Sequence, residues 1–266
     1  MRISEEVEEL KQTAEFRFYG ELNDFLPPAK RNVSFIHHLK ERASIKDAIE
    51  ALGVPHPEVD LILVNGESVD FSYLVQNGDR ISIYPPSVTT DASPVSRVRP
   101  QPVQEFRFVL DIHLGKLARY LRLLGFDVLY QNDYQDEELA DLSSREDRIL
   151  LTQDRGLLKR SVVVYGYCVR ASDPLQQVVE VLRRFNLFGA IAPFQRCLRC
   201  NGLLQPVSKE AIGDRLPPLT KQYYNEFSIC DCGQIYWKGA HYERIQRLID
   251  YIRQQDANNA RILDFG

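Results

Sequence analysis

Two short apolar segments that each end on an aspartate constrain this chain more than any other feature. Residues 106–111 read Phe-Arg-Phe-Val-Leu-Asp, and residues 149–154 read Ile-Leu-Leu-Thr-Gln-Asp. Both have the length and apolar, β-prone content of strands. Because aspartate is disfavoured inside a strand, Asp111 and Asp154 are expected at the carboxyl ends of two strands. Ligands of open α/β sheets bind at that edge.

The residues between these segments predict helices. Residues 115–125 place four apolar side chains at helical spacing and end at Gly125, a helix stop signal. A strand, a helix and a strand in this order predict a parallel sheet whose acidic ends converge. A second helix that begins at Asp136 brings a further carboxylate to the same edge, with Glu137 as its competitor.

Carboxylates that share one cleft repel each other unless a cation lies between them, and a set of oxygen ligands suits Mg²⁺ or Mn²⁺. The sequence therefore predicts a metal site formed by Asp111, Asp136 and Asp154. Each acid also has a structural interpretation. Asp136 can be the N-cap of its helix, Asp154 can cap the turn that follows it, and Asp111 can end a strand by chance.

At these residues the chain resembles the Mut-seven C-terminal RNase family, a branch of the PIN-domain nucleases. The resemblance extends from about Phe106 to Tyr242 and includes the segments Arg-Cys-Leu-Arg-Cys-Asn-Gly at 196–202 and Tyr-Trp-Lys-Gly-Ala-His-Tyr at 236–242. It implies a three-layer α/β PIN fold, divalent-metal-dependent cleavage of RNA and a zinc-ribbon-like module. The acids of the family's site would be Asp111, Asp136 and Asp154. Gln153 stands where the family often has arginine, which we interpret as a change in contacts.

Four cysteines predict a second metal site. Cys197 and Cys200 form a CxxC pair, and Cys230 and Cys232 form a CxC pair. In a chain without a secretion signal, this pairing indicates a structural Cys₄ zinc site rather than disulfides, and no βαβ context supports a redox CxxC. The fifth cysteine, Cys168, is expected to be a small buried apolar residue.

Basic side chains near the acids are candidates for contacts with RNA phosphates. The six candidates are Lys116, Arg119, Arg122, Arg155, Lys159 and Arg160. An ordinary solvated helix face is the alternative interpretation. Trp237 and its neighbours either stack on bases or pack between the zinc ribbon and the nuclease core.

The amino-terminal part has a different pattern. Two strands, a helix that ends at Gly53 and two more strands resemble the β-grasp, ubiquitin-like sulfur carriers ThiS and MoaD, and the segment Asn-Gly-Asp-Arg-Ile-Ser-Ile-Tyr-Pro-Pro at 77–86 resembles their ending closely. The carriers need a free terminal Gly-Gly, whereas this chain continues past Pro86. We therefore expect a docking module for a protein partner instead of a carrier.

The predicted fold class is α/β: a PIN-like domain with a three-layer parallel sheet and a Cys₄ zinc ribbon, preceded by an α+β β-grasp (ubiquitin-like) domain. Residues 86–104 are rich in proline and lack periodicity, which indicates a linker. The expected parts are a tail (1–13), the β-grasp domain (14–85), the linker (86–104), the PIN-like domain (105–192), the zinc ribbon (193–242) and a carboxyl-terminal helix and tail (243–266).

Charge and hydropathy limit the function. Residues 1–102 hold 16 acidic and 11 basic side chains, whereas residues 103–266 hold 21 and 22, so RNA affinity must come from local basic clusters. No apolar segment has the length of a membrane span and no signal peptide is evident, which predicts a cytoplasmic protein without membrane contact. We expect a metal-dependent ribonuclease acting on tRNA or another structured RNA. The alternative is a non-catalytic RNA-binding or adaptor protein. The oligomeric state stays open.

Overall fold

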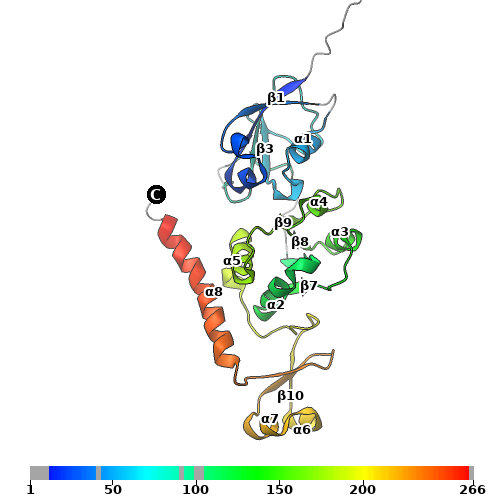
Figure 1. Cartoon of the computed structure of the whole chain (residues 1–266), viewed down its shortest axis with the longest axis vertical. Coiled ribbons are helices and arrows are strands. Elements are labelled where there is room, and N and C mark those ends of the chain that lie inside the picture. Colours follow the sequence, from blue (N-terminus) through cyan, green and yellow to red (C-terminus); the bar gives the residue numbers. More distant parts are fainter. Residues whose placement is uncertain (1–11, 40–42, 90–92, 99–104, 264–266) are drawn as a thin grey trace, which may run out of the picture. The chain divides into compact units, whose positions relative to one another are not determined.

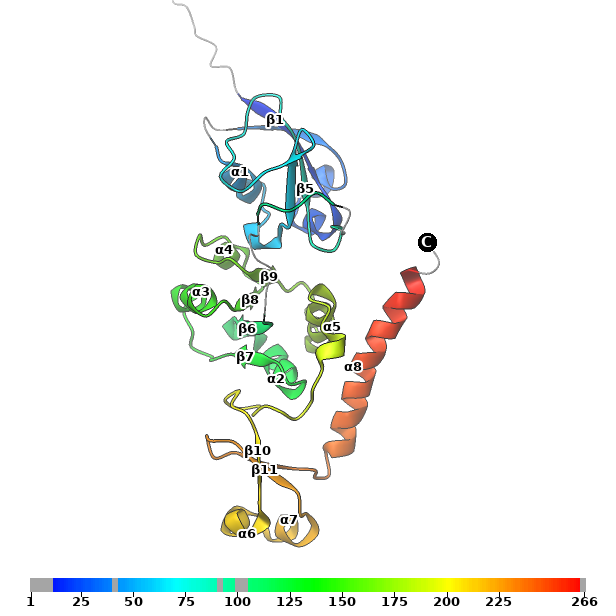
Figure 2. The ribbon, with the colours of Figure 1, turned by 180° about the vertical axis from the view of Figure 1, so that it is seen from behind.

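The computed structural model describes residues 12–39, 43–89, 93–98 and 105–263 (Figure 1). Contacts divide the chain into two compact units. The first unit holds residues 1–104 with residues 154–168, and the second holds residues 105–153 with residues 169–266. Figure 2 shows the same ribbon from behind.

The first unit contains a five-stranded sheet of β-grasp type with strand order β2-β1-β5-β3-β4, in which β1 and β5 are parallel. Its strands and helix are β1 (Thr13–Phe18), β2 (Phe35–His38), α1 (Ile45–Ala51), β3 (Leu61–Val64), β4 (Glu67–Ser68) and β5 (Arg80–Tyr84). Short 3₁₀ helices span Gly20–Phe25, Pro28–Lys30 and His56–Glu58. The predicted ubiquitin-like fold is confirmed.

Alternating apolar side chains determine which face of this sheet is buried. Phe16 and Phe18 of β1 and Ile81 and Ile83 of β5 are almost completely buried, while the residues between them are at least partly exposed. Helix α1 buries Ile45, Ala48 and Ile49, and its first turn is capped by Ser44. The opposite face of β1 and β5 therefore carries the polar residues of both strands.

Two further segments pack on the β-grasp domain. The hydroxyl of Thr89 donates to Asp60 Oδ2 at 2.8 Å and Ser68 donates to the carbonyl of Val95 at 2.9 Å, so residues of the expected linker contact this domain. Residues 154–168 contribute α4 (Arg155–Leu158) and β9 (Gly166–Cys168). The fully buried Glu58 accepts a hydrogen bond from the amide of Cys168 at 2.6 Å.

The second unit is built on three parallel strands in the order β7-β6-β8. Helices α2 and α5 pack against each other, and α3 contacts β6 and β8. The elements are β6 (Arg107–Leu110), α2 (Gly115–Leu123), β7 (Asp127–Leu129), α3 (Asp136–Arg145), β8 (Ile149–Thr152) and α5 (Pro174–Arg184), with 3₁₀ helices at Ile112–Leu114 and Phe188–Ala190. Phe108 of β6 lies in the core against Phe126 and Phe185.

Most of this unit follows the sequence pattern, with one addition. The predicted helix is present as α2 and stops before Gly125. Gly125 has a φ of 99°, and a side chain there would collide with the carbonyl of Ala192, so this position requires glycine. Strand β7 follows directly and pairs with β6 in parallel register. The sequence pattern did not predict β7, since three residues are too short to show alternation.

The remaining elements form a small antiparallel sheet and a long helix. The sheet has the order β10-β11-β12 and packs on a core that includes Ile212, Leu216, Phe227 and Ile235. The elements are β10 (Gln205–Val207), α6 (Lys209–Ile212), a 3₁₀ turn (Gly213–Arg215), α7 (Pro218–Tyr223), β11 (Phe227–Ile229), β12 (Ile235–Trp237) and α8 (Tyr242–Leu263). Helix α8, orange to red in Figures 1 and 2, packs against α5. Within the described ranges, no helix combines the length and apolar character that crossing a bilayer requires.

Candidate functional site

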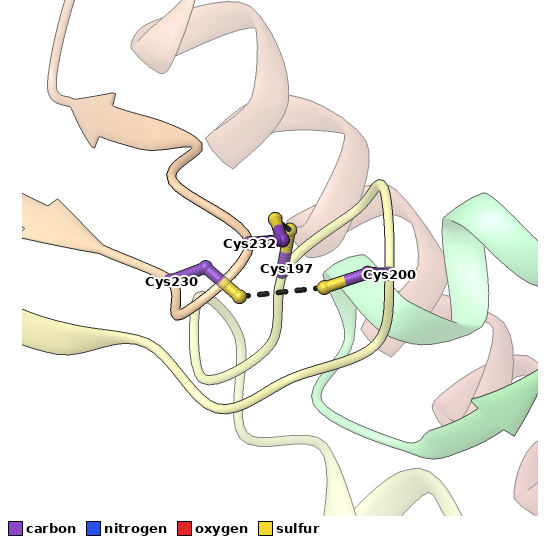
Figure 3. A group of neighbouring side chains, drawn as sticks. All are labelled: Cys197, Cys200, Cys230 and Cys232. Atoms are coloured by element: carbon purple, nitrogen blue, oxygen red, sulfur yellow. Dashed lines mark hydrogen bonds between the residues drawn. The ribbon is translucent and has the colours of Figure 1, made fainter.

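Four cysteine side chains from two separate hairpin-like loops converge on one point (Figure 3). Cys197 and Cys200 come from the loop before β10, and Cys230 and Cys232 come from the turn between β11 and β12. All four sulfur atoms lie within 4.8 Å of one another. Gly202 lies beside them, and a Cβ there would be 2.9 Å from the Cys230 sulfur, so only glycine allows the loops this close together.

The geometry of this cluster fits a tetrahedral metal ion. Zinc–thiolate bonds of about 2.3 Å place neighbouring sulfur atoms about 3.8 Å apart in a tetrahedron. The sulfur atoms of Cys197 and Cys232 are 3.7 Å apart, and those of Cys200 and Cys230 are 3.4 Å apart. All four cysteines are free of disulfides. The cluster can therefore hold a metal such as zinc, as the spacing predicts.

Polar donors favour the thiolate form of Cys197. Burial alone raises the pKa of this thiol, but hydrogen bonds from the hydroxyl of Tyr236 and the backbone amides of Cys200 and Arg199 outweigh it and lower its pKa to about 6. The Tyr236 oxygen is 3.2 Å from the Cys197 sulfur and accepts the amide proton of Leu198 at 2.9 Å. Because the thiolate is the form that binds metal, these donors prepare Cys197 as a ligand.

A set of hydrogen bonds fixes the CxxC loop to the parallel sheet. The buried guanidinium of Arg122 donates to the carbonyls of Val128 and Arg199, at 2.9 to 3.0 Å. The side chain of Asn201 accepts the amide proton of Val128 at 2.9 Å. This arrangement overturns one prediction: Arg122 is 4% exposed and cannot contact RNA at the surface. At about 100° per residue, Arg122 is turned roughly 120° from Lys116 around α2, which directs it towards the loop.

Asp127 completes these connections between the sheet and the CxxC loop. Its carboxylate pairs with Arg148 at 2.7 Å and with Arg196 at 3.2 Å, and it accepts a hydrogen bond from Asn201 at 2.9 Å. Burial raises the pKa of Asp127, but the hydrogen bonds from Arg148 and Asn201 and the two positive charges outweigh it. The pKa therefore lies below the ordinary value of 3.8.

We expect Asp127→Asn to lower the free energy of unfolding by about 2 to 4 kcal/mol at pH 7, because it removes the carboxylate shared by Arg148 and Arg196 and leaves Arg148 with Glu146 alone. A depressed pKa contributes stability that is complete above the unfolded-state pKa and is lost as the pH falls through the folded-state pKa. The deficit of the variant should therefore shrink below about pH 4. Urea unfolding followed by the fluorescence of Trp237, the single tryptophan, measures it.

The matched control is Asp141→Asn, which removes an exposed carboxylate from α3. Its unfolding free energy should stay within about 0.5 kcal/mol of the original protein. A deficit of Asp127→Asn that is equally large at pH 7 and pH 3 would contradict the role of the ionised carboxylate.

Among the acidic candidates, Asp111 has the most constrained side chain. It follows β6 directly and is 7% exposed. The buried hydroxyl of Thr152, at the end of β8, donates to Asp111 Oδ2 at 2.6 Å. Within the described residues, none donates a hydrogen bond to Oδ1. The second unit thus brings the ends of β6 and β8 together and orients one carboxylate between them.

The other acids lie at helix starts. Asp136 is the first residue of α3 and is exposed, Glu137 follows it, and the N-cap is Gln135 instead. Asp154 is the N-cap of α4 and accepts the amide proton of Gly156 at 2.6 Å, as its structural interpretation predicts. Asp154 belongs to the first unit and the other two acids to the second. Their convergence on one metal ion therefore stays a prediction.

Across the described residues, the four cysteines are the only group of three or more metal-binding side chains whose ligand atoms are gathered together. Asp111, Asp136 and Asp154 do not belong to such a group. The structure also shows residues that the sequence pattern did not reveal, namely Asp127, Asn201 and Tyr236. Only Asn201 carries a sequence signal, because it directly follows the CxxC pair.

The basic candidates divide into two groups. Lys116 and Arg119 are exposed on α2. The ammonium of Lys159 donates to the carbonyl of Glu50 at 2.7 Å, Arg155 lies over the ring of Phe25 at 4.9 Å, and Arg160 is half-buried. These contacts lie inside the first unit, and Arg155 is exposed besides, so RNA contacts of this group stay a prediction.

The aromatic candidate Trp237 is 39% exposed and tilts against Phe227. The neighbouring Lys238 pairs with Glu226 at 2.8 Å. Both expectations for this region, base stacking and packing, remain compatible with that exposure. Cys168 is 6% exposed, as expected of a small buried residue.

A parallel α/β domain with a four-cysteine module and a separate ubiquitin-like domain define a multidomain α/β protein with a candidate metal centre. Comparison with known families identifies it further. The chain belongs to the Mut7-C RNAse domain family, whose profile matches residues 106–249, more than half of the chain. Residues 11–91 match the family described as Mut7-C ubiquitin. Both matches confirm the resemblance found in the sequence and indicate a nuclease family.

Individual relatives cover smaller parts of the chain. It is 37% identical over 106 residues to the human Exonuclease mut-7 homolog. The aligned segment makes up 38% of this chain and 12% of the human protein. Two crystal structures of small archaeal modifier protein 1 from Haloferax volcanii are similar at 19% and 18% identity. They cover 28% and 29% of this chain and 98% and 99% of their own, with TM-scores of 0.23 and 0.24.

Proposed function

We propose that this chain is a divalent-metal-dependent ribonuclease that hydrolyses phosphodiester bonds in RNA. The observation that carries the proposal is Asp111, a buried carboxylate at the carboxyl end of β6. Thr152 holds one of its oxygens, and the other has no hydrogen-bond donor among the described residues. A carboxylate that is held in one orientation and whose second oxygen has no protein donor is available to a cation. Asp111 lies within the segment that matches the RNAse domain family.

The proposed ligands of Mg²⁺ or Mn²⁺ are Asp111, Asp136 and Asp154, with Glu137 as the alternative to Asp136. Bound there, the ion would supply a water of lowered pKa and neutralise charge on the leaving oxygen. Thr152 would keep the Asp111 carboxylate in a fixed orientation through its hydrogen bond. The exposed side chains of Lys116 and Arg119 would bind phosphates of the RNA.

Separate parts of the chain would have separate tasks. The four cysteines would hold a structural Zn²⁺ that keeps the CxxC loop on the sheet through Arg122 and Asn201. We assign the nuclease activity to residues 105–192, the ribbon to residues 193–242 and a binding task to the β-grasp residues 14–85. Residues 86–104 would connect them.

We expect RNA cleavage by the full chain to rise at least about 100-fold when Mg²⁺ or Mn²⁺ is restored to metal-depleted protein. Extended dialysis without a thiol-binding chelator removes the weakly held ion, and elemental analysis verifies that the zinc content is unchanged. Labelled transfer RNA and an unstructured oligonucleotide serve as parallel substrates. Cleavage that is equally fast in the depleted protein would overturn the metal-dependent mechanism.

One observation favours the non-catalytic alternative. Asp154 already uses one oxygen to cap α4, as a purely structural aspartate would. An adaptor that binds RNA through the ribbon would lose RNA affinity when zinc is removed and would show no dependence on Mg²⁺. The depletion experiment separates the two functions, because it removes Mg²⁺ and retains zinc.

A further inference from the structure

A polar cavity lies on the outer face of the β-grasp sheet. It has a volume of about 370 Å³. Its lining residues are Glu15, Arg17, Tyr19, Ser34, Asn65, Gly66, Arg80, Ile81 and Ser82. The strands β1 and β5 provide most of them, and these strands are parallel neighbours with Glu15 opposite Arg80 and Arg17 opposite Ser82. A cavity of this size is at the lower end of the range that binds a small ligand or a single nucleotide.

The cavity contains two arginines, and neither has an acidic partner in the part of the chain that the structure describes. Arg17 and Arg80 are exposed, and within the described residues neither forms an ion pair. Glu15 is the only carboxylate among the lining residues, so the cavity is positive. The surrounding residues 1–102 are acidic in total, which makes this positive charge local. A ligand with a phosphate or carboxylate group complements it.

Aromatic rings lie beside these arginines. The rings of Tyr19 and Tyr84 stack with their centroids 4.2 Å apart at an angle of 12°. The guanidinium of Arg17 lies 5.2 Å from the centroid of Tyr19. Ser34 and Ser82 add hydroxyl groups to the lining. Stacked aromatic rings, guanidinium groups and hydroxyls together are the surface on which single-stranded nucleic acid binds.

We propose that this cavity binds a nucleotide of single-stranded RNA, with Arg17 and Arg80 on its phosphate. The proposal rests on the proposed function, since it assigns to the β-grasp domain a contact with the same RNA that the nuclease domain cuts. An acidic protein segment would also match the positive charge of the arginines, but it has no base that would stack on the tyrosine rings. The cavity thus gives the β-grasp domain an RNA-binding task in place of a carrier task.

Binding to the full chain tests the proposal. The protein carries Asp111→Asn, so that RNA stays intact, and the probe is a labelled oligouridylate of about 12 nucleotides. We expect Arg17→Ala with Arg80→Ala to weaken binding by about 10-fold or more near 0.1 M salt and to reduce the salt slope by about 1.4. The control is Lys46→Ala with Arg97→Ala, which removes the same charge from the first unit outside the cavity and should change binding by less than about 2-fold.

Three outcomes overturn the proposal. In the first, both double variants weaken RNA binding equally, and in the second, neither variant weakens it. In the third, a polyglutamate peptide binds through Arg17 and Arg80, while RNA binding does not depend on these arginines. The last outcome assigns the cavity to an acidic protein partner. Circular dichroism verifies that both variants are folded. Cleavage by the protein with Asp111 intact tests the proposed function separately, so loss of arginine-dependent binding and loss of cleavage are distinguished.

Discussion

Replacing Asp111 with asparagine is expected to reduce metal-dependent RNA cleavage by at least about 100-fold. Substituting residues that merely support a metal ligand costs about 10- to 100-fold, so removal of a ligand's charge should cost more. Asparagine keeps an oxygen that can accept the hydroxyl proton of Thr152, and it has nearly the same shape. Fold and stability should therefore be retained. Single-turnover assays measure the cleavage rate, and titration with Mn²⁺ measures the affinity for the metal ion.

The control for Asp111→Asn is Asp141→Asn, which removes an equal charge from the exposed surface of α3. Its cleavage rate should equal that of the original protein. RNA should bind Asp111→Asn at least as tightly as the original protein, because one negative charge is gone. A variant that cuts RNA at the original rate, or that loses Mn²⁺ affinity no more than Asp141→Asn does, would exclude Asp111 as a ligand.

Local patterns in the sequence predict those parts of the molecule that depend on neighbouring residues. Asp111 lies at the end of a strand because aspartate follows an apolar segment of β type, and this needs no long-range information. The cysteine pairs are also local patterns. The short spacing within each pair is enough to indicate two ligands of one metal ion. The β-grasp order follows from alternation and from Gly53, which ends α1 with a φ of 102°.

Contacts between distant residues decide what the sequence could not predict. Arg122 occupies a basic helix position like Lys116 and Arg119, yet it is buried because the CxxC loop, more than 70 residues later, supplies carbonyls for it. A charge pattern on a helix does not reveal which side a later segment covers. Likewise, residues 154–168 pack with the β-grasp domain, and the buried Glu58 carries no local signal of its contact with Cys168.

Removing one zinc ligand should affect the parallel sheet as well as the ribbon. We expect Cys200→Ser to lose the metal and to lower the local stability of the CxxC loop by at least about 3 kcal/mol, because the energy of metal binding is folding energy in such sites. The amide of Val128 in β7 is held by Asn201, the residue after Cys200. Hydrogen exchange of this amide should accelerate by about 100-fold. Mass spectrometry of the intact and digested protein measures zinc content and exchange together.

The exposed Asp231 lies between two of the cysteines and offers a matched control. Asp231→Ser should retain one zinc ion per chain and the original exchange rate at Val128, since no part of its side chain is a proposed ligand. Arg122 and Asn201 both depend on the position of the loop, so the edge strand β7 and the loop should loosen together. If Cys200→Ser accelerates exchange in β11 and β12 but leaves Val128 protected, the hydrogen bonds of Arg122 and Asn201 would hold the loop without the metal. The ribbon would then be an independent module, and its zinc would have no influence on the sheet that carries Asp111.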